Sequence, residues 1–296
     1  MSETPPASQQ PLIRSWLFVP GNRPERFSKA LTSGADAVII DLEDAVAPDA
    51  KGAARQAVVD HIMQGATPEG VPAFVRINDL RSANGLRDLL AICDAAARVA
   101  HPAIAGIMVP KASCAEDITL LSDILDEAGL ALRIGALIES VAGVEQAARI
   151  ARASVRMRFV MFGGADMALD LRVRMEWDAL LSARSDVLRA AARAGIDAVD
   201  MPWIDLGDQD GYTRELQRSF GLGFTSRAAI HPAQIAAIHA ALAPSEEAVA
   251  QARDVVRASQ AAKGGVATLN GKLIEKPLVA NAERILGLAA QARTAG

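Results

Sequence analysis

Short runs of hydrophobic residues recur along the chain, and each is followed by a stretch rich in Ala, Leu and Arg whose hydrophobic positions repeat with helical spacing. This alternation is typical of a parallel β-sheet covered by helices. Eight runs are candidate strands, which is the strand count of a (β/α)₈ TIM barrel. They are Trp16–Val19, Ala37–Asp41, Ala73–Ile77, Gly106–Val109, Arg133–Ile138, Phe159–Gly163, Ala198–Met201 and Gly223–Ile230.

The alternative arrangement of these elements is a doubly wound open sheet. That fold usually carries a GxGxxG turn after its first strand, and the LFVPGN segment found here does not match it. We therefore predict an α/β protein whose residues 13–243 form a TIM barrel.

Polar residues follow most of the predicted strands. They are Pro20-Gly21-Asn22, Asp41-Leu42-Glu43-Asp44, Arg76-Ile77-Asn78, Pro110-Lys111, Glu139-Ser140, Gly164-Ala165-Asp166 and His231-Pro232. In a barrel all of these segments lie at the C-terminal rim, where TIM-barrel enzymes have their active sites. The pattern therefore predicts an enzyme with its active site at this rim.

The chain continues beyond the eighth run, and we assign residues 244–296 to C-terminal helices and a lid segment. Ser245 followed by two glutamates predicts a helix start, and the helix is expected to end near Ala262. A break at Lys263-Gly264-Gly265 and the segment ATLNGKLIEKPLV come next, and a last helix is expected over Asn281–Arg293. These residues exceed what a minimal barrel needs, so we expect them to cover a barrel rim.

Composition narrows the choice of partners and compartment. The chain has 296 residues, of which 51% are hydrophobic, and a net charge of -4, so one large domain without a nucleic-acid partner is expected. No apolar run is long enough to cross a bilayer. Residues 1–12 read as a disordered tail and not as a signal peptide. Cys93 and Cys114 lack metal-type spacing, which favours free thiols in the cytoplasm.

Two carboxylates follow adjacent strands, Glu139 after the fifth and Asp166 after the sixth. Each alone is well explained as a helix cap. Together at one rim they suit Mg²⁺, which takes one or two carboxylates and keeps other positions for water and substrate. Gly163-Gly164 allows a close approach of the backbone beside them. We predict that Glu139 and Asp166 bind Mg²⁺.

Arg76 and an acidic cluster complete the predicted site. From the third strand, Arg76 is expected to point into the barrel mouth, where a guanidinium can clamp a carboxylate or stabilise an enolate oxygen. A salt bridge to Asp41, Glu43 and Asp44 is the other reading, and both can hold together. We expect these three acids to orient metal-bound water and Arg14 and not to bind the metal themselves. Asp44 as a helix cap is the alternative.

His231 is the histidine nearest to the predicted site. It lies in an Ile-His-Pro turn after the last strand, where a general base is conceivable but ligand contact or turn packing is favoured. The other three histidines have no partner motif, and neither a nucleophile elbow nor a P-loop is found.

Seven motifs together resemble the citrate lyase β-subunit-like proteins of the HpcH/HpaI aldolase/citrate lyase superfamily, which include malyl-CoA and citramalyl-CoA lyases. They are RSWLFVPGNRPERF, DAVIIDLEDAV, VRIN, ALIESVAGV, FGGADMALDL, AIHPAQI and LNGKLIEKP. Each motif alone is weakly specific, but their common order from Arg14 to Pro277 is hard to explain otherwise.

The resemblance implies a TIM barrel that assembles as a homotrimer or a dimer of trimers and binds Mg²⁺ through Glu139 and Asp166. It implies contacts with coenzyme A and with the acyl or oxoacid part of the substrate. The matching positions are Phe18, Arg23 and Lys29 for coenzyme A, Arg76 for the acyl or oxoacid part, and Ala165, Ile230 and His231 for further substrate contacts.

In this family an aspartate in a C-terminal lid of the adjacent subunit exchanges a proton with the substrate, and Glu275 stands at that position here. The expected activity is Mg-dependent cleavage, or formation, of a 3-hydroxyacyl-CoA such as malyl-CoA, citramalyl-CoA or citryl-CoA. The products are a short acyl-CoA and a 2-oxoacid. An aldolase acting on a free hydroxyacid, and a non-catalytic or acyl-carrier-dependent subunit, are the two alternatives.

Overall fold

The computed structural model describes residues 13–65, 70–262, 267–269 and 271–294, so the expected tail over residues 1–12 and the break at residues 263–265 lie outside the described residues. The chain divides into two compact units, one over Ile13–Ile235 and one that contains the residues from Ala236 onward. Each unit is described by itself.

The first unit is a closed barrel of eight parallel strands in sequence order, and β1 pairs with β8 to close it. The predicted TIM barrel is confirmed. The strands are β1 (Ser15–Pro20), β2 (Ala37–Asp41), β3 (Ala73–Arg76), β4 (Gly106–Val109), β5 (Arg133–Ile138), β6 (Met157–Phe162), β7 (Asp197–Asp200) and β8 (Ser226–Ala229).

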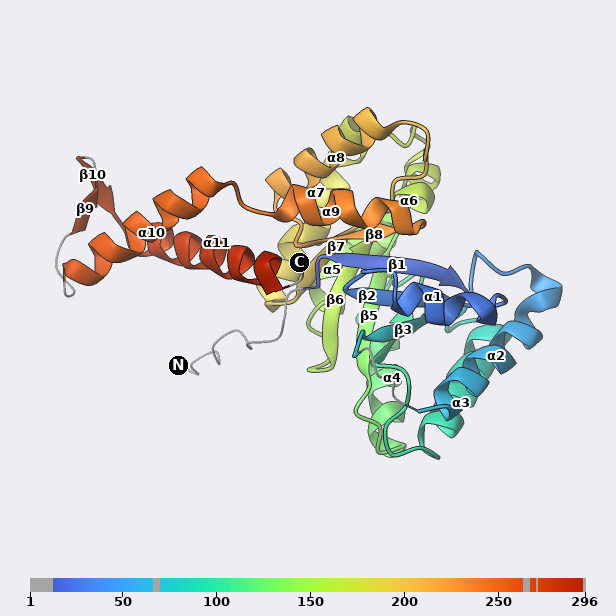
Figure 1. Ribbon diagram of the computed structural model, residues 1–296. Helices are drawn as coiled ribbons and strands as arrows, with labels where there is room; N and C mark the ends of the chain where they lie inside the picture. Colours follow the sequence, from blue (N-terminus) through green and yellow to red (C-terminus); the bar gives the residue numbers. More distant parts are fainter. Residues whose placement is uncertain (1–12, 66–69, 263–266, 270, 295–296) are drawn as a thin grey trace. The chain divides into compact units, whose positions relative to one another are not determined.

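Helices cover the outside of the barrel, as α2, α3 and α4 show in Figure 1. The helices are α1 (Phe27–Leu31), α2 (Lys51–Met63), α3 (Ala83–Ala96), α4 (Ala115–Glu127), α5 (Val141–Ile150), α6 (Gly164–Leu171), α7 (Trp177–Ala194) and α8 (Gln209–Leu222), with short 3-10 turns η1 (Pro24–Arg26), η2 (Pro48–Ala50) and η3 (Pro232–Gln234). Several begin at a side-chain cap; Ser82 Oγ, for example, accepts the Gly85 N–H at 3.0 Å.

Three aromatic rings pack together in the hydrophobic core of the barrel. The ring of Trp16 lies 4.3 Å from that of Phe159 and 5.3 Å from that of Phe74, centroid to centroid. Two glycines make room for them, because a Cβ on Gly106 would lie 2.3 Å from Phe74 and one on Gly135 would lie 2.1 Å from Phe159. The interior is therefore a packed core, and the space for a ligand lies at the rim.

The second unit contains most of α9 (Ile235–Leu242), then α10 (Glu246–Ala261), the strands β9 (Ala267–Leu269) and β10 (Lys272–Ile274), and α11 (Lys276–Thr294). The two strands form an antiparallel hairpin, and Ile274 is buried with Ala252, Val255 and Ala282 in a small core of its own. The segment ATLNGKLIEKPLV, residues 267–279, which was expected to form the lid, therefore includes this hairpin.

Helix α11 starts at Lys276, five residues before the expected start at Asn281, and the sequence-based boundary was wrong there. Pro277 lies in the first turn of the helix, where a proline is tolerated because the N–H that it lacks has no partner within the helix there. Glu275 thus stands immediately before the helix, and its carbonyl accepts the Leu278 N–H at 2.9 Å.

Candidate active site

A cavity of about 420 Å³ opens at the C-terminal ends of the strands. The predicted convergence of the strand ends is present here. Residues from seven of the eight strand ends line the cavity, among them Phe18, Asp41, Arg76, Glu139, Asp166, Met201 and Ile230.

Arg76 leaves the end of β3 and is bound by the acidic cluster on the β2 loop. Its Nε and Nη2 donate to the two carboxylate oxygens of Asp41 at 2.7 and 2.6 Å. Its Nη1 lies 3.0 Å from Glu43 Oε2 and 3.9 Å from Asp44 Oδ2. The expected salt bridge is present, and the guanidinium still lines the cavity, with its carbon 5.1 Å from the centre of the Phe18 ring.

Asp41 also fixes the backbone of its own loop. Its carboxylate accepts the N–H groups of Glu43 at 2.9 Å and Ala45 at 3.1 Å in addition to the Arg76 fork. The Leu42 carbonyl of the same loop accepts from Asn78 Nδ2 at 3.0 Å. Asp41 therefore positions Arg76 and the loop, which leaves little of its bonding capacity for a metal ion.

Glu139 is buried at the end of β5. Burial raises the pKa of its carboxyl to about 8, and the neighbouring carboxylates of Glu43 and Asp166 add to the rise. Its Oε1 accepts the Lys111 N–H at 2.8 Å. A Cβ on Gly163 would lie 2.8 Å from Oε2, so only glycine lets the β6 end pass this close to the carboxylate. The site thus brings carboxyl groups together where little water can solvate their charged forms.

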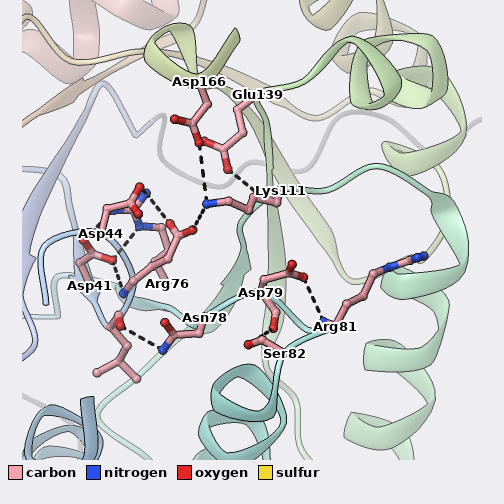
Figure 2. A network of polar contacts seen from close by, with 12 residues as sticks. Asp41, Asp44, Arg76, Asn78, Asp79, Arg81, Ser82, Lys111, Glu139 and Asp166 are labelled. Atoms are coloured by element: carbon pink, nitrogen blue, oxygen red, sulfur yellow. Dashed lines mark hydrogen bonds and ion pairs between the residues drawn. The ribbon is translucent and has the colours of Figure 1, made fainter. Parts of the chain in front are cut away.

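Asp166 and Lys111 lie beside Glu139, as Figure 2 shows. Asp166 is in the first turn of α6, where the helix dipole favours a carboxylate. Lys111 Nζ is 2.5 Å from Glu43 Oε1 and 3.7 Å from Asp166 Oδ2. Partial burial lowers the pKa of Lys111, but the hydrogen bond to Glu43 and the charges of Glu43, Asp44 and Glu139 outweigh it and raise the pKa, so the side chain is an ammonium cation beside the acids.

The sequence matches the family model described as HpcH/HpaI aldolase/citrate lyase over residues 14–232. The chain belongs to this family. A second model, described as a C-C bond lyase of the TIM-barrel fold, matches residues 177–292. The chain is thus an enzyme of a lyase family, as the motifs predicted.

Relatives in the HpcH/HpaI family are similar over nearly the whole chain. The citrate lyase subunit beta of Haemophilus influenzae is 33% identical over 93% of this chain and 96% of its own length. The L-malyl-CoA/beta-methylmalyl-CoA lyase of Cereibacter sphaeroides is 31% identical over 95% of this chain and 96% of its own.

Solved structures of the protein CitE from Mycobacterium tuberculosis are also similar. The complex with magnesium, acetoacetate and coenzyme A superposes with a TM-score of 0.78 and 34% identity, covering 94% of this chain and 98% of CitE. A structure described as the citrate lyase beta subunit of M. tuberculosis complexed with oxaloacetate and magnesium has a TM-score of 0.67 and 34% identity, covering 79% of this chain and 98% of its own.

Other residues that match family positions lie around the cavity. Phe18, Ala165 and Ile230 line it, whereas Arg23 and Lys29 are exposed on the segment after β1. His231 is exposed, and its Nδ1 accepts the Ala233 N–H at 3.2 Å, so it caps the η3 turn. This contact is turn packing, one of the two roles, with ligand contact, that the sequence favoured over a general base.

Arg14 does not meet the acidic cluster, and that expectation was wrong. It precedes β1, so it lies at the N-terminal end of the barrel, opposite to the site. There Nε and Nη2 donate to the Asp36 carboxylate at 2.9 and 2.8 Å. The first motif contains Arg14 next to functional residues, but six strand residues separate it from the rim.

Lys111 is the residue that sequence reasoning missed. Pro110-Lys111 was recognised as a polar strand end, but Lys111 received no role. The sequence feature that could have identified it is its position, because a lysine after β4 stands between the acids of β2 and those of β5 and β6 in the barrel order.

Among the described residues, no helix has the length and apolar character needed to cross a membrane.

Proposed function

We propose that the protein is a Mg²⁺-dependent carbon–carbon lyase that cleaves, or forms, a 3-hydroxyacyl-CoA. The products of cleavage are a short acyl-CoA and a 2-oxoacid. The observation that carries the proposal is the pair Glu139 and Asp166 beside a cavity that Arg76 lines. Similar proteins are named as lyases of such substrates or were solved with magnesium and coenzyme A.

The residues present fit a divalent cation. Glu139 is a buried carboxyl with a pKa raised to about 8, and Lys111 already places one positive charge between Glu43 and Asp166. No group of three or more His, Cys, Asp or Glu in the described part of the chain is arranged to hold a metal. Mg²⁺ does not need one, because it usually takes one or two carboxylates and completes its shell with water and substrate. Glu139 and Asp166 are the proposed ligands.

When bound, Mg²⁺ supplies a Lewis acid that polarises the hydroxyl and carboxylate oxygens of the substrate. Arg76 stabilises the enolate oxygen of the acyl-CoA. Asp41 holds two of its nitrogens in a planar fork, so the guanidinium is oriented before substrate arrives. Its carbon lies over the Phe18 ring, which restricts it further. Asp41, Glu43 and Asp44 orient Arg76 and water at the metal.

The proposed coenzyme A contacts are Phe18, Arg23 and Lys29. Phe18 offers an apolar face inside the cavity, and the two exposed cations suit the phosphates of coenzyme A. Ala165 and Ile230 contribute apolar cavity wall. His231 lies next to Ile230 and is proposed as a substrate contact through its turn, with no acid–base step assigned to it.

Glu275 is proposed to exchange the proton of the enolate carbon from a lid, and a neighbouring subunit of a homotrimer or hexamer is proposed to supply this lid. The hairpin that precedes Glu275 is a defined element with its own small core. Glu275 itself is exposed before α11.

We also propose a cytoplasmic location, since Cys93 and Cys114 are both free thiols.

The cavity wall supports a substrate whose oxoacid part has one carboxylate. Among the described residues that line the cavity, Arg76 is the single cation, and Asp41 and Glu43 already neutralise it. Much of the remaining wall is apolar, including Leu137, Met161, Phe162, Met175 and Met201. A second carboxylate would lie against this wall unpaired, which costs free energy. Malyl-CoA and citramalyl-CoA are therefore favoured over citryl-CoA.

The test is a turnover panel of malyl-CoA, citramalyl-CoA and citryl-CoA with purified protein, with Mg²⁺ and with excess chelator. Turnover of one of them that requires Mg²⁺ is expected. An aldolase of free hydroxyacids would not be inhibited by coenzyme A, whereas the proposed enzyme is. If the protein turned over no free thioester, the result would instead favour a carrier-dependent subunit. The similarity to citrate lyase subunit beta is the reason for considering this alternative.

A further inference from the structure

Lys111 adopts a backbone conformation that is uncommon for a side chain of its kind. Its φ is +51°, in the left-handed region, and apart from glycines only Arg172 shares a positive φ among the described residues. In this conformation the Lys111 N–H points at Glu139 Oε1 at 2.8 Å. Strained backbone of this kind persists where the surroundings require it, often at functional sites.

The side chain of Lys111 contacts the other acids of the site. Nζ is 2.5 Å from Glu43 Oε1 and 3.7 Å from Asp166 Oδ2, and the second oxygen of Glu43 is 3.0 Å from Arg76 Nη1. One residue thus contacts both proposed metal ligands and Glu43, one of the acids that bind Arg76. Figure 2 shows Lys111 beside Glu139 and Asp166.

The acidic groups around Lys111 outnumber the cations beside them. The five carboxyl groups of the site face two cationic side chains, Arg76 and Lys111. The carboxylates are Asp41, Glu43, Asp44, Glu139 and Asp166. Three of them, Asp41, Glu43 and Glu139, are buried. Buried carboxylates are stable as ions only when cations accompany them, so the ammonium matters most when no metal is bound.

We propose that the Lys111 ammonium is a placeholder cation, which holds Asp166 and Glu43 together until Mg²⁺ binds and then moves away from Asp166 while keeping Glu43. This inference rests on the proposed function, because it takes Glu139 and Asp166 as the metal ligands. Lys111 is then a positioning residue. Its N–H orients one ligand, and its side chain competes with the metal at the other.

Titration of the full-length protein with MgCl₂ in a calorimeter tests the competition. In Lys111→Met the competing charge is gone while the chain length is nearly kept. Mg²⁺ should therefore bind on the order of tenfold tighter, as expected for a unit charge removed from within several ångströms. Lys111→Gly should bind Mg²⁺ more tightly as well. Because glycine readily adopts the positive φ of this position, this variant replaces Lys111→Met in the titration if Lys111→Met does not fold.

The control is Arg133→Met, which removes one positive charge at the opposite end of the barrel. Arg133 is exposed and begins β5, the strand that Glu139 follows. Its Mg²⁺ affinity should equal that of the wild type. A gain as large as in Lys111→Met would mean that net charge alone explains the effect and would overturn the inference.

Thermal unfolding gives a second readout that does not involve activity. Without Mg²⁺, Lys111→Met should unfold at a lower temperature than the wild type, and saturating Mg²⁺ should remove most of the difference. Unchanged or weaker Mg²⁺ binding by both Lys111 variants overturns the placeholder role. If the wild-type protein binds no Mg²⁺ at all, the proposed function itself fails, which the same titration distinguishes.

Discussion

Glu139 and Asp166 are the residues on which the proposed chemistry depends most. We expect Glu139→Gln and Asp166→Asn each to abolish Mg²⁺-dependent turnover. Even loss of an outer partner of a metal ligand typically costs about 10–100-fold, and loss of a ligand should cost more. The barrel should stay folded. An uncharged amide at position 139 avoids the free-energy cost of burying a charge, and this cost is what raises the pKa of Glu139 to about 8.

Steady-state assays over a range of Mg²⁺ concentrations, with circular dichroism to monitor folding, measure both effects. Wild-type activity of either variant in chelator would show that these carboxylates do not bind the metal. Leu137→Val, a conservative change in the same cavity wall, is the matched control and should respond to Mg²⁺ as the wild type does.

Arg76 provides a second prediction at the residue scale. Arg76→Lys keeps the charge but cannot reproduce the two parallel bonds to Asp41, at 2.7 and 2.6 Å, together with the contact to Glu43. We expect kcat to fall on the order of 100-fold, the cost of a misplaced group. The Mg²⁺ affinity should change little. An unchanged kcat/KM would restrict Arg76 to pairing with the acidic loop.

Residue types at strand ends were a good guide to this site, because parallel strands bring their C-terminal ends to one rim whatever the loops do. Glu139, Asp166, Arg76 and the acidic loop could therefore be placed from sequence. Arg14 could not be placed in this way. It is close in sequence to Phe18 and Arg23, but it precedes β1 and therefore lies at the N-terminal end of the barrel. The role of Lys111 depends on a positive φ and on side-chain contacts, neither of which has a sequence pattern.

At the scale of elements, helix α2 carries a buried histidine that should make stability depend on pH. His61 lies against the Phe27 ring with 5.4 Å between ring centroids, and its Nε2 has no hydrogen-bond partner in the described residues. Burial lowers the pKa of His61. The folded protein therefore keeps the neutral ring at pH values where the unfolded chain takes up a proton.

The direction of the effect follows from this difference in pKa. As the pH falls below about 6.5, the unfolded state binds more protons than the folded state, so the free energy of unfolding decreases by up to about 1.4 kcal/mol per pH unit. The decrease ends once the pH is below the folded pKa. Urea unfolding at pH 7.5 and 5.5 should show a smaller pH effect in His61→Phe than in the wild type. His101→Gln, at an exposed position, should keep the wild-type difference.

The strands were more predictable than the C-terminal elements. Strands β2, β4 and β5 have the bounds expected from their hydrophobic runs, because burial on both faces leaves a continuous apolar signal. The hairpin of β9 and β10 carries only short strands with polar residues. Its stability comes from packing of Ile274 against α10 and α11, which only the folded unit reveals.

The whole molecule consists of two units with separate cores, and this division bears on the proposed lid. The barrel core is centred on Trp16, Phe74 and Phe159, and the second unit is held by residues such as Val255 and Ile274. A change at Glu275 should therefore leave the barrel intact. The fold class can be predicted from the alternation of strand-like and helix-like hydrophobic patterns along the whole chain. The assembly cannot, because no pattern in one chain specifies which subunit supplies the lid.

Complementation between two inactive variants tests chemistry and assembly together. Glu275→Ala lacks the proposed proton-exchanging carboxyl, and Asp166→Asn lacks a proposed metal ligand. If a neighbour supplies the lid, co-expressed chains that mix at random should place an intact lid on an intact barrel at about a quarter of the sites of a closed ring of subunits. If each chain closes its own site, no site has both groups, and the mixture stays inactive.

The same experiment separates the lid from a surface role of Glu275. Were Glu275 only to pair with Lys272 or Lys276, the contact would contribute about 0–1 kcal/mol, and Glu275→Ala alone would keep nearly full activity. That result would remove Glu275 from the mechanism. Glu275→Asp, which keeps the carboxyl, is the control and should remain active. An inactive Glu275→Ala without complementation would retain the catalytic role and assign the lid to the same chain, because closing a lid excludes water from the enolate whichever subunit provides it.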